Sequence, residues 1–359
     1  MEIKMRKKVL LGMSGGVDSS VSAILLQKQG YEVIGATMRL WEEESNSENG
    51  NTSTAIQDAK KVCEKLGIEH HVIDLRDEFK KRVIDNFICS YQCAKTPNPC
   101  VECNKFMKFN AFYKIAQDLE CEYIATGHYA RIEYSEKYNQ YVLMKAKAEK
   151  KDQSYFLYGI DKAILSKVIF PLSEFTDKEE IRKIAEENGL EVAKKKDSQE
   201  VCFIPNNDYT SFLKEQSTEN IEKSGNIVLN NGEVLGKHTG LINYTVGQRK
   251  GLGIAYKEPL YVLKLDTQKN QVVVGTEKEL YKKELIANEL NFLVDEIDFS
   301  KKIEVEAKIR YRAKEAKATL EIKDGIAKVI FEEPQRAITP GQSVVFYRDN
   351  IVIGGGKIN

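Results

Sequence analysis

The chain has 359 residues, of which 42% are hydrophobic and 30% are charged, and its 54 basic side chains balance its 54 acidic ones. This length and composition favour a folded protein of two or three domains over a disordered or fibrous one. No apolar run approaches the roughly 18 residues of a membrane span, and the opening residues lack the pattern of a secretory leader. We therefore expect a protein of the reducing cytoplasm, where its seven cysteines are more often reactive or metal-binding than disulfide-bonded.

The first half of the chain alternates between apolar, β-rich runs and amphipathic helical patterns. The predicted strands cover 7–12, 31–38, 69–75 and 121–127, and the predicted helices cover 17–29, 54–66, 76–88 and 104–118. Further helical patterns follow at 161–168 and 177–188. This alternation predicts an α/β domain with a parallel sheet, whose ligands bind beyond the carboxyl ends of the strands.

The pattern changes near residue 205, where short runs of period two and hairpin signals such as Asn231-Gly232 replace the helices. We predict three domains: a catalytic domain at 1–205, a small β-rich domain at 206–280 and a C-terminal β-barrel at 281–359. The polar tract at 42–53 is predicted to be an exposed, mobile loop.

The stretch GMSGGVDS lies between the first predicted strand and the first predicted helix. Its glycines permit close approach of a ligand, and backbone N–H groups at a helix start attract an anion, most simply a phosphate. The spacing matches neither a Walker loop nor the dinucleotide fingerprint. It resembles the PP-loop of the N-type ATP pyrophosphatases (adenine nucleotide alpha hydrolase-like proteins), which implies ATP binding by Gly12, Met13, Ser14, Gly15, Gly16, Val17, Asp18 and Ser19.

One of these residues has a further role, and two more residues are assigned to this nucleotide site. Asp18 is expected to help hold Mg²⁺, because magnesium prefers carboxylate oxygen ligands. Met38, at the end of the second predicted strand, and Gly127, in TGHYAR at the end of the fourth, lie where the adenosine is expected to meet the sheet.

Two cysteines fall in polar segments suited to sulfur chemistry. Cys103 precedes the helix predicted from Asn104, and a thiol at a helix N-terminus has a lowered pKa. Cys202 lies in a non-helical segment, KDSQEVCFIP. Together they suit a transfer in which one thiol carries a persulfide and the other resolves it, leaving a disulfide.

Other readings of the cysteines remain open. Cys63 and Cys121 fit core positions. Cys89, Cys93, Cys100 and Cys103 are close enough in sequence for a structural zinc site, although their spacing matches no common zinc finger. Cys100, Cys103 and Cys202 could instead hold an iron–sulfur cluster with one open iron position.

The region 301–317 carries seven basic and three acidic side chains in an otherwise neutral protein. Its alternation predicts one strand with a buried face and an exposed, increasingly basic face, which favours contact with a phosphate backbone. The segment GQRKGLG at 247–253 adds a basic loop.

Several motifs occur in one order over most of the chain: GMSGGVDSSV, GATMRLW, TPNPCVECNKFMKF, TGHYAR, KDQSYFLY, KDSQEVCFIP, NYTVGQRKGLGI and KIRYR. Together they resemble the tRNA-specific 2-thiouridylases (the MnmA family), which thiolate the wobble uridine of certain tRNAs. The resemblance implies Cys103 as the nucleophile and Cys202 as the persulfide carrier. It implies substrate contacts by Asn98, Pro99, Cys100, His128, Lys151, Asp152, Gln153, Arg310, Tyr311 and Gln342.

One residue departs from the family pattern. Many members carry an aspartate where this chain has Cys100. A thiol there weakens an aspartate-assisted mechanism and favours the iron–sulfur alternative.

The sequence therefore predicts a tRNA 2-thiouridylase that uses ATP to adenylate a uridine oxygen and replaces it with sulfur from a relay protein fed by a cysteine desulfurase. Two other functions compete with it. One is another PP-loop ligase, such as an amidating enzyme that uses ammonia, and the other is a zinc-stabilised RNA-binding protein with a vestigial nucleotide site.

Overall fold

The computed structural model describes residues 6–41, 54–195, 201–204, 208–217 and 222–359. The predicted loop at 42–53 lies outside the described residues. Contacts divide the chain into two compact units, one of residues 1–83, 100–199 and 350–352 and the other of residues 84–99, 200–349 and 353–359.

A five-stranded parallel sheet forms the centre of the first unit, in the spatial order β3-β2-β1-β4-β7. Its strands are β1 (Lys8–Gly12), β2 (Glu32–Arg39), β3 (Glu69–Asp74), β4 (Tyr123–Ala125) and β7 (Val168–Ile169). The middle strand, β1, is apolar and buried because both faces of a parallel sheet are covered by helices. The sheet confirms the predicted fold class for this part of the chain.

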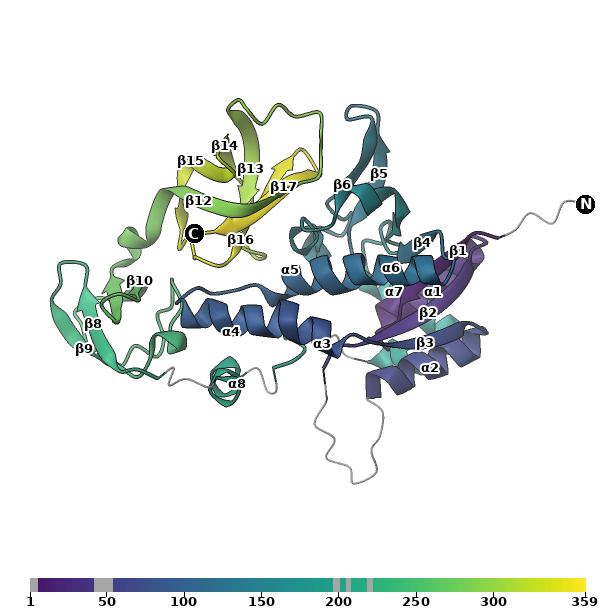
Figure 1. Ribbon diagram of the computed structural model, residues 1–359, viewed down its shortest axis with the longest axis horizontal. Helices are drawn as coiled ribbons and strands as arrows, with labels where there is room; N and C mark the ends of the chain where they lie inside the picture. Colours follow the sequence, from purple (N-terminus) through teal and green to yellow (C-terminus); the bar gives the residue numbers. More distant parts are fainter. Residues whose placement is uncertain (1–5, 42–53, 196–200, 205–207, 218–221) are drawn as a thin grey trace, which may run out of the picture. The chain divides into compact units, whose positions relative to one another are not determined.

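Helices α1 (Val17–Lys28), α2 (Thr54–Leu66) and α7 (Lys178–Glu187) share a hydrophobic core with this sheet (Figure 1). Contacts between α2 and the sheet are close, because a Cβ at Gly35 on β2 would lie 2.8 Å from Cys63 Sγ. Cys63 and Cys121 are both buried, as predicted.

The remaining helical segments differ from the predictions mainly at their ends. The helix predicted at 76–88 runs to Gln92, and the helix predicted at 104–118 begins at Pro99. The segments are α3 (Arg76–Phe79), η1 (Lys80–Ile84), α4 (Asp85–Gln92), α5 (Pro99–Cys103), η2 (Asn104–Ala111) and α6 (Phe112–Asp118). The pattern at 161–168 forms the short helix η5 (Lys162–Lys167) followed by β7.

Short elements complete the first unit. A hairpin of β5 (Arg131–Ser135) and β6 (Gln140–Met144) follows β4, and the sequence analysis did not predict it. The short 3₁₀ helices are η3 (Glu149–Lys151), η4 (Ser154–Phe156) and η6 (Glu191–Lys194).

Among its described residues, the second unit contains two β structures, the helix α4 and a helix that was not predicted, α8 (Tyr209–Gln216). A four-stranded sheet has the order β10-β11-β8-β9, from β8 (Gly225–Leu229), β9 (Val234–His238), β10 (Tyr261–Asp266) and β11 (Gln271–Gly275). The 3₁₀ helices η8 (Leu241–Asn243) and η9 (Glu277–Leu280) flank β10 and β11 in the chain.

Six antiparallel strands follow in the order β12-β15-β14-β13-β16-β17, and pairing of β12 with β17 closes them into a barrel (Figure 1). They are β12 (Tyr281–Phe292), β13 (Ile303–Lys308), β14 (Ala316–Lys323), β15 (Ile326–Arg336), β16 (Ser343–Arg348) and β17 (Ile351–Ile358). The predicted C-terminal barrel is confirmed.

The single strand predicted at 301–317 is wrong. β13 ends at Lys308, a turn follows, and β14 begins at Ala316. Lys308 is buried and pairs with Glu315 across this turn at 3.3 Å, so it does not belong to an exposed basic face. The alternation of apolar and charged residues continues through the turn, so the sequence pattern did not indicate it.

Candidate functional site

The phosphate turn lies between the end of β1 and the start of α1. The Met13 N–H donates to Ala36 O at 2.8 Å, and the Thr37 hydroxyl donates to Met13 O at 2.8 Å, which fixes the turn to β2. Gly15 has a φ of +67°, and a Cβ there would lie 2.4 Å from Ala55 O. The turn therefore requires glycine at this position for both its conformation and its close contact with α2.

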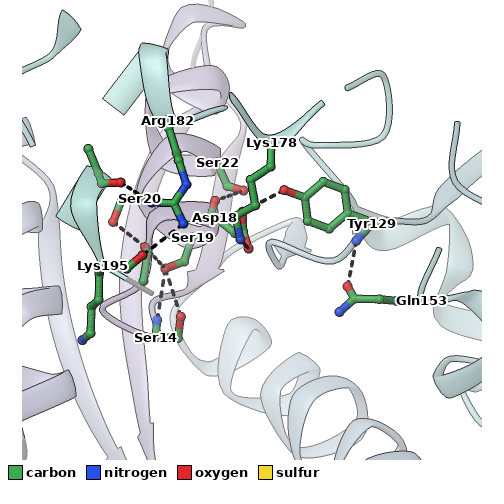
Figure 2. Close-up of polar contacts among 12 residues, drawn as sticks. Ser14, Asp18, Ser19, Ser20, Ser22, Tyr129, Gln153, Lys178, Arg182 and Lys195 are labelled. Atoms are coloured by element: carbon green, nitrogen blue, oxygen red, sulfur yellow. Dashed lines mark hydrogen bonds and ion pairs between the residues drawn. The ribbon is translucent and has the colours of Figure 1, made fainter. Parts of the chain in front are cut away.

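Serine hydroxyls form hydrogen bonds within the turn (Figure 2). Ser14 and Ser19 are linked twice, by the Ser14 N–H to Ser19 Oγ at 3.3 Å and between their hydroxyl oxygens at 3.2 Å. The Ser20 hydroxyl donates to Gly16 O at 2.8 Å. Gly16 caps the start of α1, whose positive dipole end lies at the turn.

Asp18, in the first turn of α1, accepts two hydrogen bonds from side chains far away in the sequence. The Tyr129 hydroxyl donates to Asp18 Oδ1 at 2.8 Å, and Lys178 Nζ donates to Oδ2 at 3.0 Å. Figure 2 shows the two donors converging on this carboxylate. Because both side chains are partly buried, solvent screens this ion pair less than it screens a pair at the exposed surface.

A second lysine contacts the other side of the turn. Lys195 Nζ lies 3.3 Å from Gly15 O and 2.8 Å from Asp58 Oδ2. Arg182 on α7 donates to Ala193 O at 2.5 Å and to Lys195 O at 3.1 Å, which ties this segment to the helix that carries Lys178.

The residues assigned to adenosine lie at the same edge of the sheet. A Cβ at Gly12 would lie 3.7 Å from Met38 Cε, so Met38 lies close to the end of β1. A Cβ at Gly127 would lie 3.0 Å from Ser19 N and from Asp18 C. The structure thus brings Gly12, Met38 and Gly127 together around the phosphate turn, whereas Met13 and Val17 are buried in the core.

Cys103 differs from its prediction. It is the last residue of α5, inside a helical stretch that continues directly into η2, and its exposed fraction is 7%. Burial raises the pKa of the Cys103 thiol to about 11, while the nearby Lys108 cation acts in the opposite direction. The predicted lowering of its pKa by a helix N-terminus is wrong, because the helix begins four residues earlier, at Pro99.

Cys100 is one helical turn before Cys103 and is exposed. Cys202 is also exposed and belongs to the second unit, in the described segment 201–204. Its neighbour Phe203 packs edge-to-face on Phe87 of α4, with ring centroids 5.5 Å apart. Among the described residues, no three or more histidine, cysteine, aspartate or glutamate side chains gather as a metal site.

His128 is packed between aromatic rings, with its centroid 6.0 Å from that of Phe109 and 6.1 Å from that of Phe170. Its Nδ1 is 2.7 Å from Thr126 Oγ1. Burial lowers the pKa of His128 well below its usual value, so the ring is neutral at physiological pH.

The predicted tRNA-contacting segment 151–153 also makes internal contacts. Asp152 is buried and accepts from Ala146 N at 2.9 Å and from the Ser154 hydroxyl at 2.8 Å. Gln153 accepts from Tyr129 N at 2.9 Å. This hydrogen bond joins the segment to Tyr129, whose hydroxyl contacts Asp18.

In the second unit, Gln342 supports the loop that carries Asn98 and Pro99. Its side-chain amide donates to Thr96 O at 2.9 Å and to Pro97 O at 3.3 Å. The Thr96 N–H donates to Pro340 O at 2.8 Å. Two of the predicted substrate-contacting segments of this unit, the loop with Asn98 and Pro99 and the segment with Gln342, are therefore held together.

Arg310 lies in the turn between β13 and β14, beside Tyr311. Its guanidinium donates to Arg336 O at 2.5 Å and to Ala337 O at 2.8 Å. A pocket of about 490 Å³ is lined by four cations, Arg310, Arg312, Lys314 and Arg336, and by one carboxylate, Glu315, which pairs with Lys308. This concentration of cations suits a phosphate group.

Four residues at the turn were not predicted from the sequence: Tyr129, Lys178, Arg182 and Lys195. Tyr129 lies inside the TGHYAR motif, which was a usable signal. Lys178 and Lys195 are ordinary lysines in charged segments, and only the packing of α7 and η6 against α1 brings them to the turn.

The chain matches three family models: the tRNA methyl transferase HUP domain over residues 7–206, the tRNA methyl transferase PRC-barrel domain over 210–276 and the Aminomethyltransferase beta-barrel domain over 282–358. It is 51% identical to a tRNA-specific 2-thiouridylase MnmA of Clostridium botulinum, with 98% of each chain covered. It is 49% identical to one of Acetivibrio thermocellus, with 98% of this chain and 99% of that chain covered. Among solved structures, an NMN synthetase from Francisella tularensis matches at 20% identity over 54% of this chain and 67% of that chain, with a TM-score of 0.35.

Proposed function

Because the chain belongs to the tRNA-specific 2-thiouridylase family, we propose that it converts a wobble uridine of tRNA to 2-thiouridine, using ATP and a cysteine-borne sulfur. Two features of the first unit carry the proposal together. One is the phosphate turn, which is fixed to β2, and the other is Cys103, which lies one helical turn after Cys100. The relatives of matching length share the name of this activity.

The first step uses the phosphate turn. ATP binds with its polyphosphate against the N–H groups of the turn and its adenosine toward Met38 and Gly127. The oxygen on carbon two of the uridine, flipped out of its stack, attacks the α-phosphorus, and pyrophosphate leaves. The oxygen is then bonded to AMP, which is a far better leaving group.

The second step transfers sulfur. The terminal sulfur of a Cys202 persulfide bonds to carbon two, and the bond from that carbon to the AMP oxygen breaks. The Cys103 thiolate then attacks Cys202 Sγ, which breaks the persulfide bond and leaves 2-thiouridine. A Cys103–Cys202 disulfide results, and a thiol reductant must reduce it before the next turnover.

The proposed partners follow from this scheme. A sulfur relay protein fed by a cysteine desulfurase reloads Cys202. The anticodon region of tRNA contacts the segments that carry Asn98, Lys151 and Arg310, in the cytoplasm. Cys100 beside Cys103 favours one alternative for the same thiolation, in which Cys100, Cys103 and Cys202 hold an iron–sulfur cluster.

The test is mass spectrometry of tRNA digests after incubation with ATP and a sulfur donor. We expect Cys103→Ser and Cys202→Ser each to abolish 2-thiouridine, while Cys89→Ser, a change at an exposed cysteine outside the site, retains it. Full product from both site variants would refute these roles. Iron and sulfide analysis of anaerobically purified protein distinguishes the cluster from the persulfide.

A further inference from the structure

Both carboxylate oxygens of Asp18 already have a side-chain partner, which disfavours its expected role as a magnesium ligand. Each of its two oxygens already accepts a hydrogen bond, from the Tyr129 hydroxyl and from the Lys178 ammonium. A Mg²⁺ bound at Oδ2 would lie beside a cation that is itself 3.0 Å from that oxygen. Two cations at one carboxylate oxygen repel each other strongly in a partly buried site.

The pair formed by Lys178 and Asp18 is partly shielded from solvent. The side chain of Lys178 is 13% exposed and that of Asp18 is 29% exposed. Lys178 is the first residue of α7, whose N-cap Asp177 accepts from Glu179 N, so the helix start fixes the position of the lysine. The packing of α7 against α1 then carries its ammonium to the turn.

The same charge pairing occurs on the other side of the turn, where Lys195 contacts Asp58 at 2.8 Å. Asp18 and Asp58 are therefore both neutralised by lysines. These lysines, at positions 178 and 195, both come from the part of the chain that follows β7. This matters for the ligand, because an unpaired carboxylate at the start of α1 would repel a polyphosphate from the N–H groups that bind it.

We propose that Lys178 is a positioning residue that neutralises and fixes Asp18 together with Tyr129, so that the phosphate turn accepts the polyphosphate of ATP, and that Asp18 serves this ion pair rather than a metal ion. This inference rests on the proposed use of ATP. It extends that function by naming the residues that set the charge of the nucleotide site.

A double-mutant cycle on the full-length chain tests the inference. We expect Lys178→Met to raise the Kd and KM for ATP by about tenfold, because it leaves the Asp18 charge uncompensated, and to change kcat less. Asp18→Asn in the same chain removes that charge, so the double variant Asp18→Asn/Lys178→Met is expected to recover most of the lost affinity. Lys178→Arg keeps the cation and is expected to bind ATP nearly as the parent does.

Lys183→Met is the matched control, since Lys183 lies on the same helix, is exposed and pairs only loosely with Glu187, at 3.9 Å. Its ATP affinity is expected to equal that of the parent chain. Thermal unfolding of each variant shows whether it folds, and Lys178→Gln, which also removes the cation, replaces Lys178→Met in the cycle if the latter does not.

Three results would overturn the inference. They are unchanged ATP affinity in Lys178→Met, a double variant that binds ATP no better than Lys178→Met, and a loss of Mg²⁺ dependence confined to Asp18→Asn. ATP binding is measured without tRNA, so a parent chain that binds ATP but forms no 2-thiouridine refutes the proposed function and leaves this inference standing.

Discussion

At the scale of single residues, the position of Cys103 determines how the proposed chemistry depends on pH. Burial raises the pKa of its thiol to about 11, so only a small fraction is thiolate at neutral pH. The thiolate is the reactive form. We expect the single-turnover rate of sulfur transfer to rise by about tenfold per pH unit between roughly pH 7 and 9, where the thiolate fraction is small. A rate independent of pH over this range would show that Cys103 is not the group that ionises.

Lys108 is the cation that opposes this rise in the Cys103 pKa. Lys108→Met is therefore expected to raise the pKa further and to lower the rate of sulfur transfer at pH 7 by about threefold to tenfold. The measurement is the single-turnover rate at several pH values, with Lys114→Met, at an exposed lysine of α6, as the control. Equal rates for the two variants would contradict the prediction.

The sequence identified Cys103 as a candidate but predicted the wrong sign for its pKa shift. The proline at position 99 begins the helix, as proline often does at the first helical position. The sequence prediction instead placed the start of the helix at Asn104, directly after Cys103. Lys178 shows the complementary difficulty, because a lysine 160 positions from its carboxylate partner has no local signal.

At the scale of elements, α4 ends in a strained cap. Ala94 has a φ of +55°, and the Lys95 N–H donates to Ser90 O while the Ala94 N–H donates to Tyr91 O, both at 2.9 Å. This is the Schellman arrangement, in which glycine is favoured at the left-handed position. Ala94→Gly is expected to raise the free energy of unfolding by about 0.5–1 kcal/mol, since it removes the Cβ clash of the left-handed conformation.

Thermal or denaturant unfolding measures this effect, with Ala111→Gly inside the helical segment η2 as a control that is expected to destabilise. A lower stability of Ala94→Gly would contradict the cap assignment.

The sequence predicted elements well where periodicity and turn residues agreed, as in β1, α1 and the phosphate turn between them. It failed at 301–317, where the alternation of apolar and charged residues continued through the turn after Lys308. The hairpin of β5 and β6 was missed because it interrupts an otherwise regular alternation of strands and helices. Strand order and closure of the barrel depend on pairs such as Ala287 with Ile358, which lie far apart in the chain.

At the scale of the whole molecule, a chain of zero formal net charge must bind RNA through local clusters of cations. Arg312 and Lys314 are exposed beside the pocket at the turn after β13, whereas Arg310 is engaged with backbone carbonyls. Arg312→Gln/Lys314→Gln is expected to weaken tRNA binding and to reduce the slope of log affinity against log salt by about one per lost phosphate contact.

Filter binding of tRNA over a range of salt concentrations measures this slope, and Lys183→Gln on α7 serves as the control. A slope that is the same in the double variant and the parent would exclude this surface from tRNA binding.

Within the described ranges, no helix is both long and apolar enough to cross a bilayer.

The central claim is that ATP activates the oxygen on carbon two of the uridine before sulfur replaces it. The most direct measurement uses tRNA whose wobble uridine carries a heavy oxygen isotope at that position, followed by mass spectrometry of the nucleotide products. The account predicts that the heavy oxygen appears in the phosphate of AMP in step with 2-thiouridine formation. Unlabelled AMP alongside 2-thiouridine would contradict it.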